Sequence, residues 1–416
     1  MLQDTSRVTP TDKHADIKPA TDRGETLSAF EPLLLSAGSR HRKPLADLAL
    51  ELTAASTGLK RSLPAGVVMA LSALVRSMNC YYSNLIEGHD THPVDIERAM
   101  RDDYSADSRK RDLQLEARAH VAVQAWIDEG ALRGRAFTVD ALCEVHLRFG
   151  ELLPPELLVV RNPETQEEAA VVPGELRRRD VKVGQHVPAS PGAVPRFLAR
   201  YVEVYGQLGR AETILAAAGA HHRLLWIHPF VDGNGRVARL LSHAVLLETL
   251  DTGALWSVAR GLARRDADYK AHLVACDGSR RSDLDGRGAL SEEALAAFTT
   301  FFLEVCLDQV RFMESLVEPG RLRERILRWA AEESRRGALP AQAGQLLEAV
   351  LFRGELPRGD VASLLSTGER NARRVMSALL AARVLASDSP RESLRLAFPA
   401  TLAGQWMPGL FPDQRR

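Results

Sequence analysis

The sequence predicts a mainly helical protein with one small β-hairpin in its middle and one pair of short strands near its end. Apolar residues recur at three- and four-residue steps over most of the 416 residues, which is the spacing of a buried helical face. Strand-like alternation is confined to residues 168–190 and 384–396. The chain is too long for one ordinary core, so we expect two or three domains.

The composition bounds the class of protein. Lys and Arg together number 54, as do Asp and Glu, so the overall charge favours no class of partner. The four cysteines lack the spacing of a disulfide scaffold or a zinc site. No apolar run has the length of a membrane span, and the N-terminus has no apolar leader. We therefore expect a cytoplasmic protein without membrane association, whose four thiols are buried: Cys80, Cys143, Cys276 and Cys306.

The first quarter of the chain is predicted to be a tail followed by helices. Residues 1–27 are polar and are expected to form a disordered tail. Residues 28–107 are expected to be a helical region whose main helix spans about 64–88. Near the end of that helix, Ser83 and Glu87 lie one turn apart on one face. A glutamate is mildly unfavourable at a helix C-terminus, and a buried guanidinium partner would remove that objection.

The middle of the chain combines helices with a predicted hairpin. Residues 108–150 have the pattern of two helices, and His146 in the second is interpreted as a surface or semi-buried histidine. Residues 168–190 alternate around the turn at Pro173 and Gly174, which predicts a β-hairpin.

The most informative stretch is residues 228–239, which contain a glycine turn followed by a helical pattern. The turn at 233–235 lets the backbone approach a ligand closely, because glycine has no Cβ. The free N–H groups at the start of the helix favour an anion. Arg236 and Arg239 lie one turn apart, and guanidinium groups bind phosphate oxygens bidentately. These features suit a polyphosphate.

Two further side chains of this stretch add reactive groups. Asp232 offers a hard oxygen ligand to a Mg²⁺ ion held mainly by substrate phosphates. His228 can take a proton near neutral pH. A plain capping turn with solvated arginines would not require all of these residues at once. The combination therefore predicts phosphoryl or nucleotidyl transfer.

Residues 228–239 also resemble the signature of the Fic family, H-x-F-x-[D/E]-G-N-G-R-x-x-R, at every fixed position. The family is helical and mostly transfers AMP from ATP to a Ser, Thr or Tyr hydroxyl of a target protein. The resemblance implies a Fic core at 108–317, with His228 as the base, Asp232 as the Mg²⁺ ligand and Arg239 on the γ-phosphate. It implies an ATP site that includes Gly233, Asn234, Gly235, Arg236, Val237 and Ala238.

A second resemblance concerns the helix at 64–88. Ser83, Glu87 and Gly88 meet the pattern [S/T]-x-x-x-E-[G/N], which one class of Fic proteins carries on an inhibitory helix. In that class the glutamate pairs with the second arginine of the signature, which is Arg239 here, and obstructs the γ-phosphate. One guanidinium cannot serve a carboxylate and a triphosphate in the same geometry. The resemblance thus implies that the resting enzyme is inhibited and that Glu87 is part of the ATP site.

Two more parts of the ATP site are implied by the family. Residues Val181, Lys182, Val183 and Gly184 resemble the V-x-[VI]-G segment of the Fic flap. An unpaired edge there would accept a target segment as an added strand, which presents its hydroxyl without specifying its sequence. Tyr269 and Asp277 are the candidates for contact with the adenosine, although the family usually has Tyr-Tyr and Asn at such places.

The C-terminal part is predicted to be a separate unit that begins after the Glu-Pro-Gly boundary at 318–320. Residues 321–400 have the order helix–turn–helix then hairpin, which resembles a winged helix, and 401–416 are expected to be a tail. Residues 321–416 contain 16 Arg and 10 acidic residues, a net charge of +6. DNA contact is the hypothesis for this basic unit, and packing or dimer formation is the alternative. The candidate DNA-binding residues are Arg370, Arg373 and Arg374.

The sequence therefore predicts an autoinhibited protein adenylyltransferase that uses ATP and Mg²⁺ and modifies a target protein or itself. Two alternatives remain open. In the first, Glu87 positions a water molecule and the enzyme removes AMP, alone or in addition to adding it. In the second, the protein is a DNA-binding transcriptional regulator whose Fic domain only senses a nucleotide. The intact His228 argues against the second alternative, since sensing needs no base.

Overall fold

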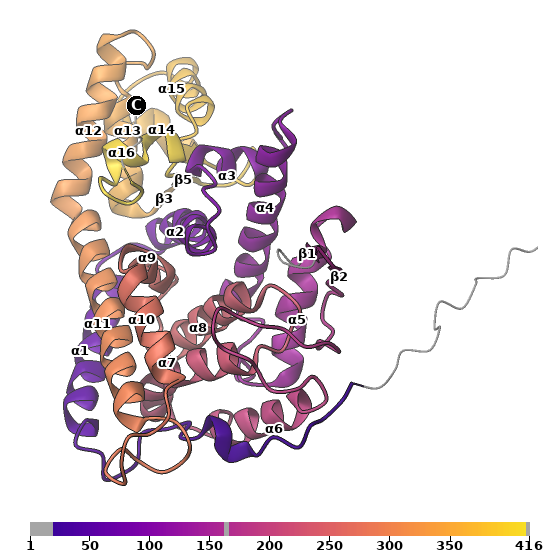
Figure 1. Cartoon of the computed structure of the whole chain (residues 1–416). Coiled ribbons are helices and arrows are strands. Elements are labelled where there is room, and N and C mark those ends of the chain that lie inside the picture. Colours follow the sequence, from indigo (N-terminus) through magenta and orange to yellow (C-terminus); the bar gives the residue numbers. More distant parts are fainter. Residues whose placement is uncertain (1–19, 162–165, 413–416) are drawn as a thin grey trace, which may run out of the picture.

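The computed structural model describes residues 20–161 and 166–412, and the chain in these ranges is mainly helical, as predicted (Figure 1). The helices are α1 (Arg42–Arg61), α2 (Ala65–Ile86), α3 (Pro93–Ala99), α4 (Ser108–Asp128), α5 (Val139–Gly150), α6 (Val194–Tyr205), α7 (Arg210–Ile227), α8 (Asn234–Leu250), α9 (Val258–Arg264), α10 (Asp266–Cys276), α11 (Glu292–Val317), α12 (Pro319–Arg335), α13 (Ala343–Arg353), α14 (Val361–Leu364), α15 (Glu369–Ala381) and α16 (Ala403–Trp406). The strands are β1 (Val159–Arg161), β2 (Glu168–Ala170), β3 (Glu355–Leu356), β4 (Leu385–Ala386) and β5 (Leu394–Leu396).

The centre of the molecule is the pair α7 and α8, which pack against each other and are joined by the loop at 228–233. The long helix α11 packs against α7, and α1 lies along α11 (Figure 1). Helix α2 packs against α4, α8 and α9, so its C-terminal end is brought to the start of α8. This packing places two segments 150 residues apart in one site.

Two local signals define the helices that meet there. Helix α2 begins after Pro64, which caps it in an extended conformation, and Gly88 at φ +85° follows its end. Helix α8 is preceded by Gly233 at φ +80°, a left-handed conformation that glycine adopts without strain. Both boundaries agree with the sequence prediction.

The β-hairpin is present, but it lies earlier in the chain than the alternation suggested. Strands β1 and β2 pair antiparallel, with Val160 opposite Ala169. The turn at Pro173 and Gly174 follows the hairpin instead of joining its strands. Residues 171–193 form a long loop in which Val183 and His186 make an isolated antiparallel bridge. The segment 181–184 therefore forms no strand, and its one bridge closes a tight turn.

Both predicted tails are wrong within the described residues. Residues 20–26 lie against the loop at 180–192 and α6, where the Thr21 carbonyl accepts from the Gly192 N–H at 2.9 Å. At the other end, Trp406, Met407 and Leu410 are buried, and the Leu410 carbonyl accepts from the Tyr82 hydroxyl at 3.0 Å. Polar contacts hold the N-terminal segment, such as the ion pair of Asp22 with Arg196, whereas buried apolar side chains hold the C-terminal one. The rest of both predicted tails, 1–19 and 413–416, lies outside the described residues.

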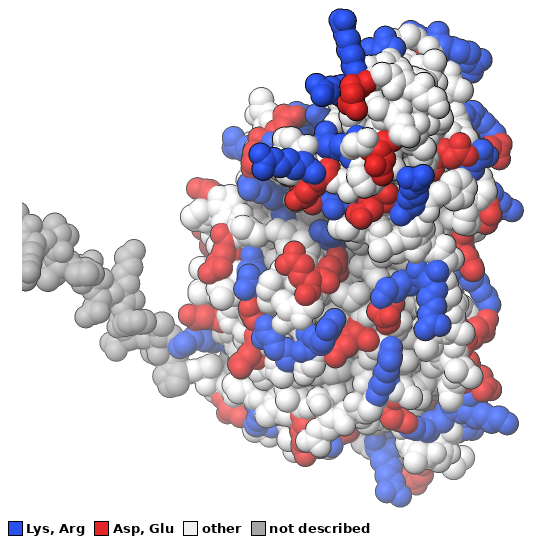
Figure 2. Space-filling view, turned by 180° about the vertical axis from the view of Figure 1, so that it is seen from behind, with Lys and Arg blue, Asp and Glu red and all other residues white. Residues whose placement is uncertain are grey.

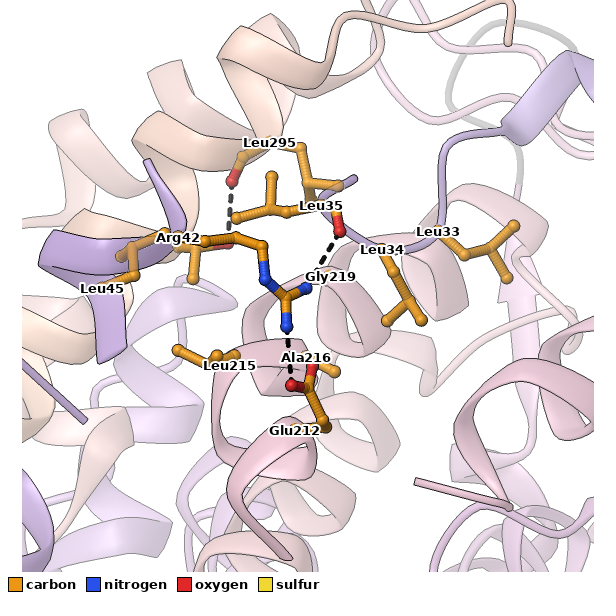
Figure 3. Close-up of a pocket in the computed structure, with 11 residues that line it drawn as sticks. Leu33, Leu34, Leu35, Arg42, Leu45, Glu212, Leu215, Ala216, Gly219 and Leu295 are labelled. Carbon is orange, nitrogen blue, oxygen red and sulfur yellow. Dashed lines mark hydrogen bonds and ion pairs between the residues drawn. The ribbon is translucent and has the colours of Figure 1, made fainter. Parts of the chain in front are cut away.

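Arg42 fastens the N-terminal segment to the helical core (Figure 3). Its guanidinium donates to the Leu35 carbonyl at 3.2 Å and to the Glu212 carboxylate at 2.6 Å. The cavity beside it has a volume of about 20 Å³ and is otherwise lined mainly by leucine side chains. Such a volume holds about one water molecule, so we interpret this cavity as a packing gap and not as a substrate site.

The C-terminal elements follow the predicted order, with one additional strand. Helices α14 and α15 form a helix–turn–helix pair, and β4 and β5 pair antiparallel after it. The extra strand β3 pairs with β5, which gives the strand order β3–β5–β4. These elements form one end of the molecule, above α2 and beside α3 in Figure 1. They are not independent of the rest, because β5 packs against α2 and α12 continues directly from α11.

Two further comparisons with the predictions concern helix continuity and membrane spans. The helix expected at 256–277 is divided into α9 and α10, because the backbone of Arg265 leaves the helical conformation at φ −121°. Within the described ranges, no single helix is long and apolar enough to cross a membrane. Together α1 and α2 meet those criteria, but they meet at a bend of 118°.

Candidate active site

The loop between α7 and α8 is held rigidly by the side chain of Asn234. The Asn234 Oδ1 accepts from the Phe230 N–H, and its Nδ2 donates to the Phe230 carbonyl, both at 2.9 Å. Asn234 and Phe230 are 3 % and 0 % exposed, so water does not compete for these bonds. The asparagine of the glycine turn thus closes the loop on itself and fixes the start of α8.

His228 lies at the end of α7 in a left-handed backbone conformation, with φ 51° and ψ 64°. Its Nδ1 lies 3.3 Å from the Leu225 carbonyl oxygen, which can only accept. The neutral imidazole therefore carries its proton on Nδ1, and Nε2 keeps a lone pair available to take a proton. Burial lowers the pKa of His228 to about 4, so the ring is neutral at physiological pH.

Asp232 and Arg236 form an ion pair at the mouth of the loop, with 2.8 Å between Arg236 Nη2 and Asp232 Oδ2. The Asp232 side chain is 49 % exposed, whereas that of Arg236 is 12 % exposed and lies 4.9 Å from the centre of the Phe149 ring. Within the described part of the chain, no three His, Cys, Asp or Glu side chains gather in a metal-binding group. One exposed carboxylate fits Mg²⁺, which usually takes one or two carboxylates plus substrate phosphates.

Arg239, in the second turn of α8, is paired with Glu87 at the end of α2. Its Nε also donates to Ser83 Oγ at 2.8 Å, and its Nη2 donates to the Ser83 carbonyl at 3.2 Å. Arg239 is 4 % exposed, so this cation is held away from water. Burial would raise the pKa of Glu87, but the charge and hydrogen bond of Arg239 outweigh it and lower that pKa.

The Glu87 carboxylate lies over the start of α8. A Cβ added to Gly235 would collide with Glu87 Oε1 and would lie 3.0 Å from Arg239 Nη1. The carboxylate therefore sits at the positive end of α8, where the helix dipole and the free N–H groups favour an anion. The sequence suggested the pairing of Glu87 with a guanidinium, and the structure brings the two side chains together.

His146 is a site residue whose role the sequence did not indicate. It is 5 % exposed and not a surface histidine; its Nδ1 accepts from the Gly174 N–H at 2.8 Å. Its Nε2 lies 3.2 Å from the Asp232 carbonyl oxygen, and its ring stacks on Phe230 at 3.8 Å between centres. Burial lowers the pKa of His146 to about 4, which preserves the neutral ring that both hydrogen bonds need. Spacing could not reveal this residue, because its partner lies 86 residues away.

Arg177 is a second site residue whose role the sequence did not indicate. It is 2 % exposed, and burial lowers the pKa of its guanidinium to about 10. Its Nε donates to the His228 carbonyl at 2.7 Å, and its main-chain N–H donates to the Pro229 carbonyl at 2.8 Å. In the sequence this residue belongs to the basic run 177–179, which resembles a solvated surface patch. Only Arg177 of the run is buried.

The other predicted ATP-site residues lie near the loop but differ in exposure. Tyr269 is 2 % exposed, and its hydroxyl lies 2.7 Å from His221 Nε2. Asp277 lies 3.1 Å from His222 Nε2 and 4.0 Å from His186 Nδ1, so it faces both α7 and the loop at 181–186. The segment 181–184 is largely exposed.

The region that contains this site is similar in sequence to known proteins. The Fic/DOC family profile matches residues 136–246. Protein adenylyltransferase Fic of Drosophila willistoni is 28 % identical over 202 residues, which cover 46 % of this chain and 37 % of that protein. The protein of the same name from Culex quinquefasciatus is 30 % identical over 174 residues, covering 40 % and 31 %. The matched region is thus about a third of the length of these relatives.

A solved structure gives the same result for the fold. A Fic family protein from Desulfovibrio desulfuricans superimposes with a TM-score of 0.50 over 88 % of this chain and 98 % of that chain, at 18 % identity. The matched profile includes the loop, His228, Asp232, both arginines of the glycine turn and the newly placed His146 and Arg177. Residues 136–246 therefore match the Fic/DOC family profile, and the loop at 228–239 lies within the matched region.

Proposed function

We propose that this protein is an autoinhibited adenylyltransferase that transfers AMP from ATP to a hydroxyl group of a target protein. The observation that carries the proposal is the arrangement of one neutral base, one exposed carboxylate and two guanidinium groups around the start of α8. The adenylyltransferase names of the two insect relatives support AMP as the transferred group.

His228 takes the role of base in this proposal. Its Nε2 removes the proton of the target hydroxyl, the hydroxyl oxygen forms a bond to the α-phosphorus, and pyrophosphate leaves from the opposite side. A pKa of about 4 makes the free imidazole a weak base. The negative charge of a nearby triphosphate favours the protonated imidazole, so we expect substrate binding to raise this pKa toward the working range.

The remaining groups would bind the phosphates. The start of α8 and Arg236 would hold the α- and β-phosphates, and Arg239 would hold the γ-phosphate once Glu87 leaves it. Asp232 would hold a Mg²⁺ ion, whose charge would neutralise the phosphate oxygens. Fixed positive groups aimed at the phosphates supply most of the acceleration in reactions of this type.

Inhibition follows from the position of Glu87 in this proposal. Its carboxylate lies at the start of α8 and engages Arg239, so it occupies the place and the cation that the γ-phosphate needs. Like charges repel there in a poorly solvated setting, which disfavours a productive triphosphate. Removal of this carboxylate is therefore expected to activate transfer.

Intact-mass spectrometry after incubation with ATP and Mg²⁺ tests both parts of the proposal. We expect no adduct on the wild type, one or more added AMP masses on Glu87→Gly, and none on Glu87→Gly with His228→Ala. Phosphate or pyrophosphate adducts would instead identify another transferred group. If no variant gains mass with itself or with a cell extract as target, the adenylyltransferase proposal is wrong.

A second proposal concerns the C-terminal elements: α15 and the β4–β5 hairpin form a winged helix that contacts the phosphate backbone of DNA. Arg370, Arg373 and Arg374 are exposed on α15, and none of them makes a hydrogen bond or ion pair with any described residue. Figure 2 shows Lys and Arg side chains gathered with some acidic ones at this end of the molecule. Exposed arginines on the second helix of a helix–turn–helix suit phosphate contacts.

A further inference from the structure

The guanidinium of Arg177 is buried without any carboxylate partner among the described residues, and it uses all three nitrogens on main-chain carbonyls. Nε donates to His228, Nη1 donates to Arg179 at 3.1 Å, and Nη2 donates to Ala189 and Ile227. A buried cation is costly unless its donors are satisfied, so these carbonyls must be held in place around it.

The carbonyls that Arg177 binds belong to two different parts of the site. Arg179 and Ala189 lie at the two ends of the exposed loop 180–188, which contains the flap segment 181–184. Ile227 and His228 lie at the end of α7, where the backbone turns into the left-handed conformation that aims the imidazole. The guanidinium of Arg177 thus fixes the two ends of the flap loop and the backbone of His228 relative to each other.

Other contacts also restrain the loop 180–188 and its ends, but they do not reach His228. From outside, the N-terminal segment holds the same loop ends, because Arg23 pairs with Asp180 and Glu25 Oε1 accepts from the Ser190 N–H at 2.8 Å. Within the loop 180–188, His186 Nε2 lies 2.8 Å from the Trp226 carbonyl oxygen. Of these contacts, only those of Arg177 reach the peptide of His228 itself.

We infer that Arg177 is a positioning residue that sets the distance between a target segment held by the flap and the Nε2 of His228. This inference rests on the adenylyltransferase proposal for the identity of the reaction. The hydrogen bonds by which Arg177 joins the loop to His228 do not depend on that proposal. A shift of about 1 Å between reacting groups lowers a rate roughly 100-fold. Loss of Arg177 should therefore lower the rate of transfer while the phosphate site, built on α8, stays intact.

The test compares Arg177→Ala, Arg177→Lys and the control Arg178→Ala, each combined with Glu87→Gly. Arg178 is the exposed neighbour in the same basic run, and its side chain makes no hydrogen bond or ion pair with a described residue. We expect the rate constant of transfer to fall roughly 10- to 100-fold in both Arg177 variants, with ATP affinity by calorimetry within about twofold. Lysine should not substitute, since it lacks the planar array of donors.

Two measurements separate a positioning role from a loss of folding. Millimolar guanidinium chloride should restore a measurable part of the rate to Arg177→Ala by refilling the cavity, whereas tetramethylammonium chloride should not. Hydrogen exchange should accelerate in 178–190 and 227–232 of Arg177→Ala and Arg177→Lys, and remain at the control level elsewhere. Unchanged exchange in both segments, or unchanged rates in both variants, would overturn the inference.

The exchange experiment also separates this inference from the proposed reaction. If Glu87→Gly with an intact Arg177 transfers no AMP, the adenylyltransferase proposal fails, and the exchange pattern alone then decides whether Arg177 joins the flap to the loop. If transfer occurs and Arg177→Ala retains the full rate, the reaction stands and the positioning role fails.

Discussion

Glu87 and Arg239 lie 152 residues apart in the chain and form an ion pair at the start of α8. The Glu87 side chain is 37 % exposed, whereas that of Arg239 is 3 % exposed, so the carboxylate can leave for solvent and the guanidinium cannot. This asymmetry means that release of the pair leaves a buried cation in need of a new anion. A γ-phosphate is the anion that we propose.

Ser83 should help to hold Arg239 in the position in which it pairs with Glu87. Ser83→Ala removes the hydroxyl that accepts from Arg239 Nε and keeps the Glu87 carboxylate. We expect weak activation of self-modification, below that of Glu87→Gly, because one of several restraints on the guanidinium is lost. Glu87→Gln should lie between the two, since the amide keeps a hydrogen bond and loses the charge. Initial rates of AMP incorporation rank the three variants, and a Ser83→Ala rate above that of Glu87→Gly would contradict this order.

The base should be separable from nucleotide binding. His228→Ala in the Glu87→Gly background should lose transfer by roughly 100-fold or more, as expected for removal of a general base. Its affinity for Mg²⁺·ATP should change by less than about threefold, because the phosphate groups are assigned to α8 and the arginines. Calorimetric titration alongside the mass assay measures both quantities. A parallel loss of affinity would assign His228 to binding.

His146 should hold the main chain of Asp232 in place through its hydrogen bond to the Asp232 carbonyl oxygen. His146→Ala removes both hydrogen bonds and the stacked ring, and should destabilise the protein by roughly 2 kcal/mol. In the Glu87→Gly background, the Mg²⁺ concentration for half-maximal transfer should rise, because the loop that holds the Asp232 carboxylate is less fixed. His146→Asn can keep the hydrogen bond from the Gly174 N–H, because its Oδ1 takes the position of Nδ1, and should restore part of the effect. An unchanged Mg²⁺ requirement in both variants would limit His146 to a folding role.

Buried histidines should make the protein sensitive to mild acid. Burial lowers the pKa of His120 and His221 to about 3 and the pKa of His146, His222 and His228 to about 4. The unfolded chain has histidine pKa values near 6.5, so it binds more protons than the folded chain below that pH. The free energy of unfolding is therefore unaffected above about pH 6.5 and falls as the pH drops toward 4, by up to about 3 kcal/mol per histidine.

His120 offers the sharpest control for that prediction. Its Nδ1 is buried and has no hydrogen-bond partner among the described residues. His120→Leu should remove one titrating group and flatten the dependence of stability on pH between 6.5 and 4 by about one proton. Chemical denaturation at pH 7.5, 6.0 and 5.0 measures the slope. The same slope in the variant and the wild type would show that His120 does not titrate with folding.

The arginines of α15 should give a salt-dependent signal if the C-terminal unit binds DNA. Replacement of Arg370, Arg373 and Arg374 by alanine should weaken binding of a labelled duplex and reduce the slope of log K against log salt by about 2 to 3. Arg335→Ala, an exposed arginine on α12, serves as the control. Fluorescence anisotropy at several salt concentrations measures the slopes. Binding to single-stranded RNA alone, or no binding at low salt, would contradict the proposal.

The sequence alone identified the candidate catalytic stretch and predicted the class of fold. Residues 228–239 are local in the chain, so their spacing already places a turn, a helix start and two guanidinium groups together. Helical periodicity predicted most of the elements, because the spacing of the apolar residues that form a helix face is contained in that segment of the sequence. The pairing of Glu87 with Arg239 could be predicted because each of the two residues belongs to a recognisable motif.

The tertiary structure decided the contacts between distant segments. His146 and Arg177 bind main-chain carbonyls. Every residue has such a carbonyl, so the amino-acid sequence cannot show which of them is bound. Strand pairing depends on which segments meet, so the alternation at 168–190 did not reveal that the strands are β1 and β2. The segment that ends at 412 is held through residues such as Leu410, which is buried and whose carbonyl accepts from Tyr82 of α2 and Arg260 of α9. Local patterns thus determine the reactive groups, and packing determines how they are held.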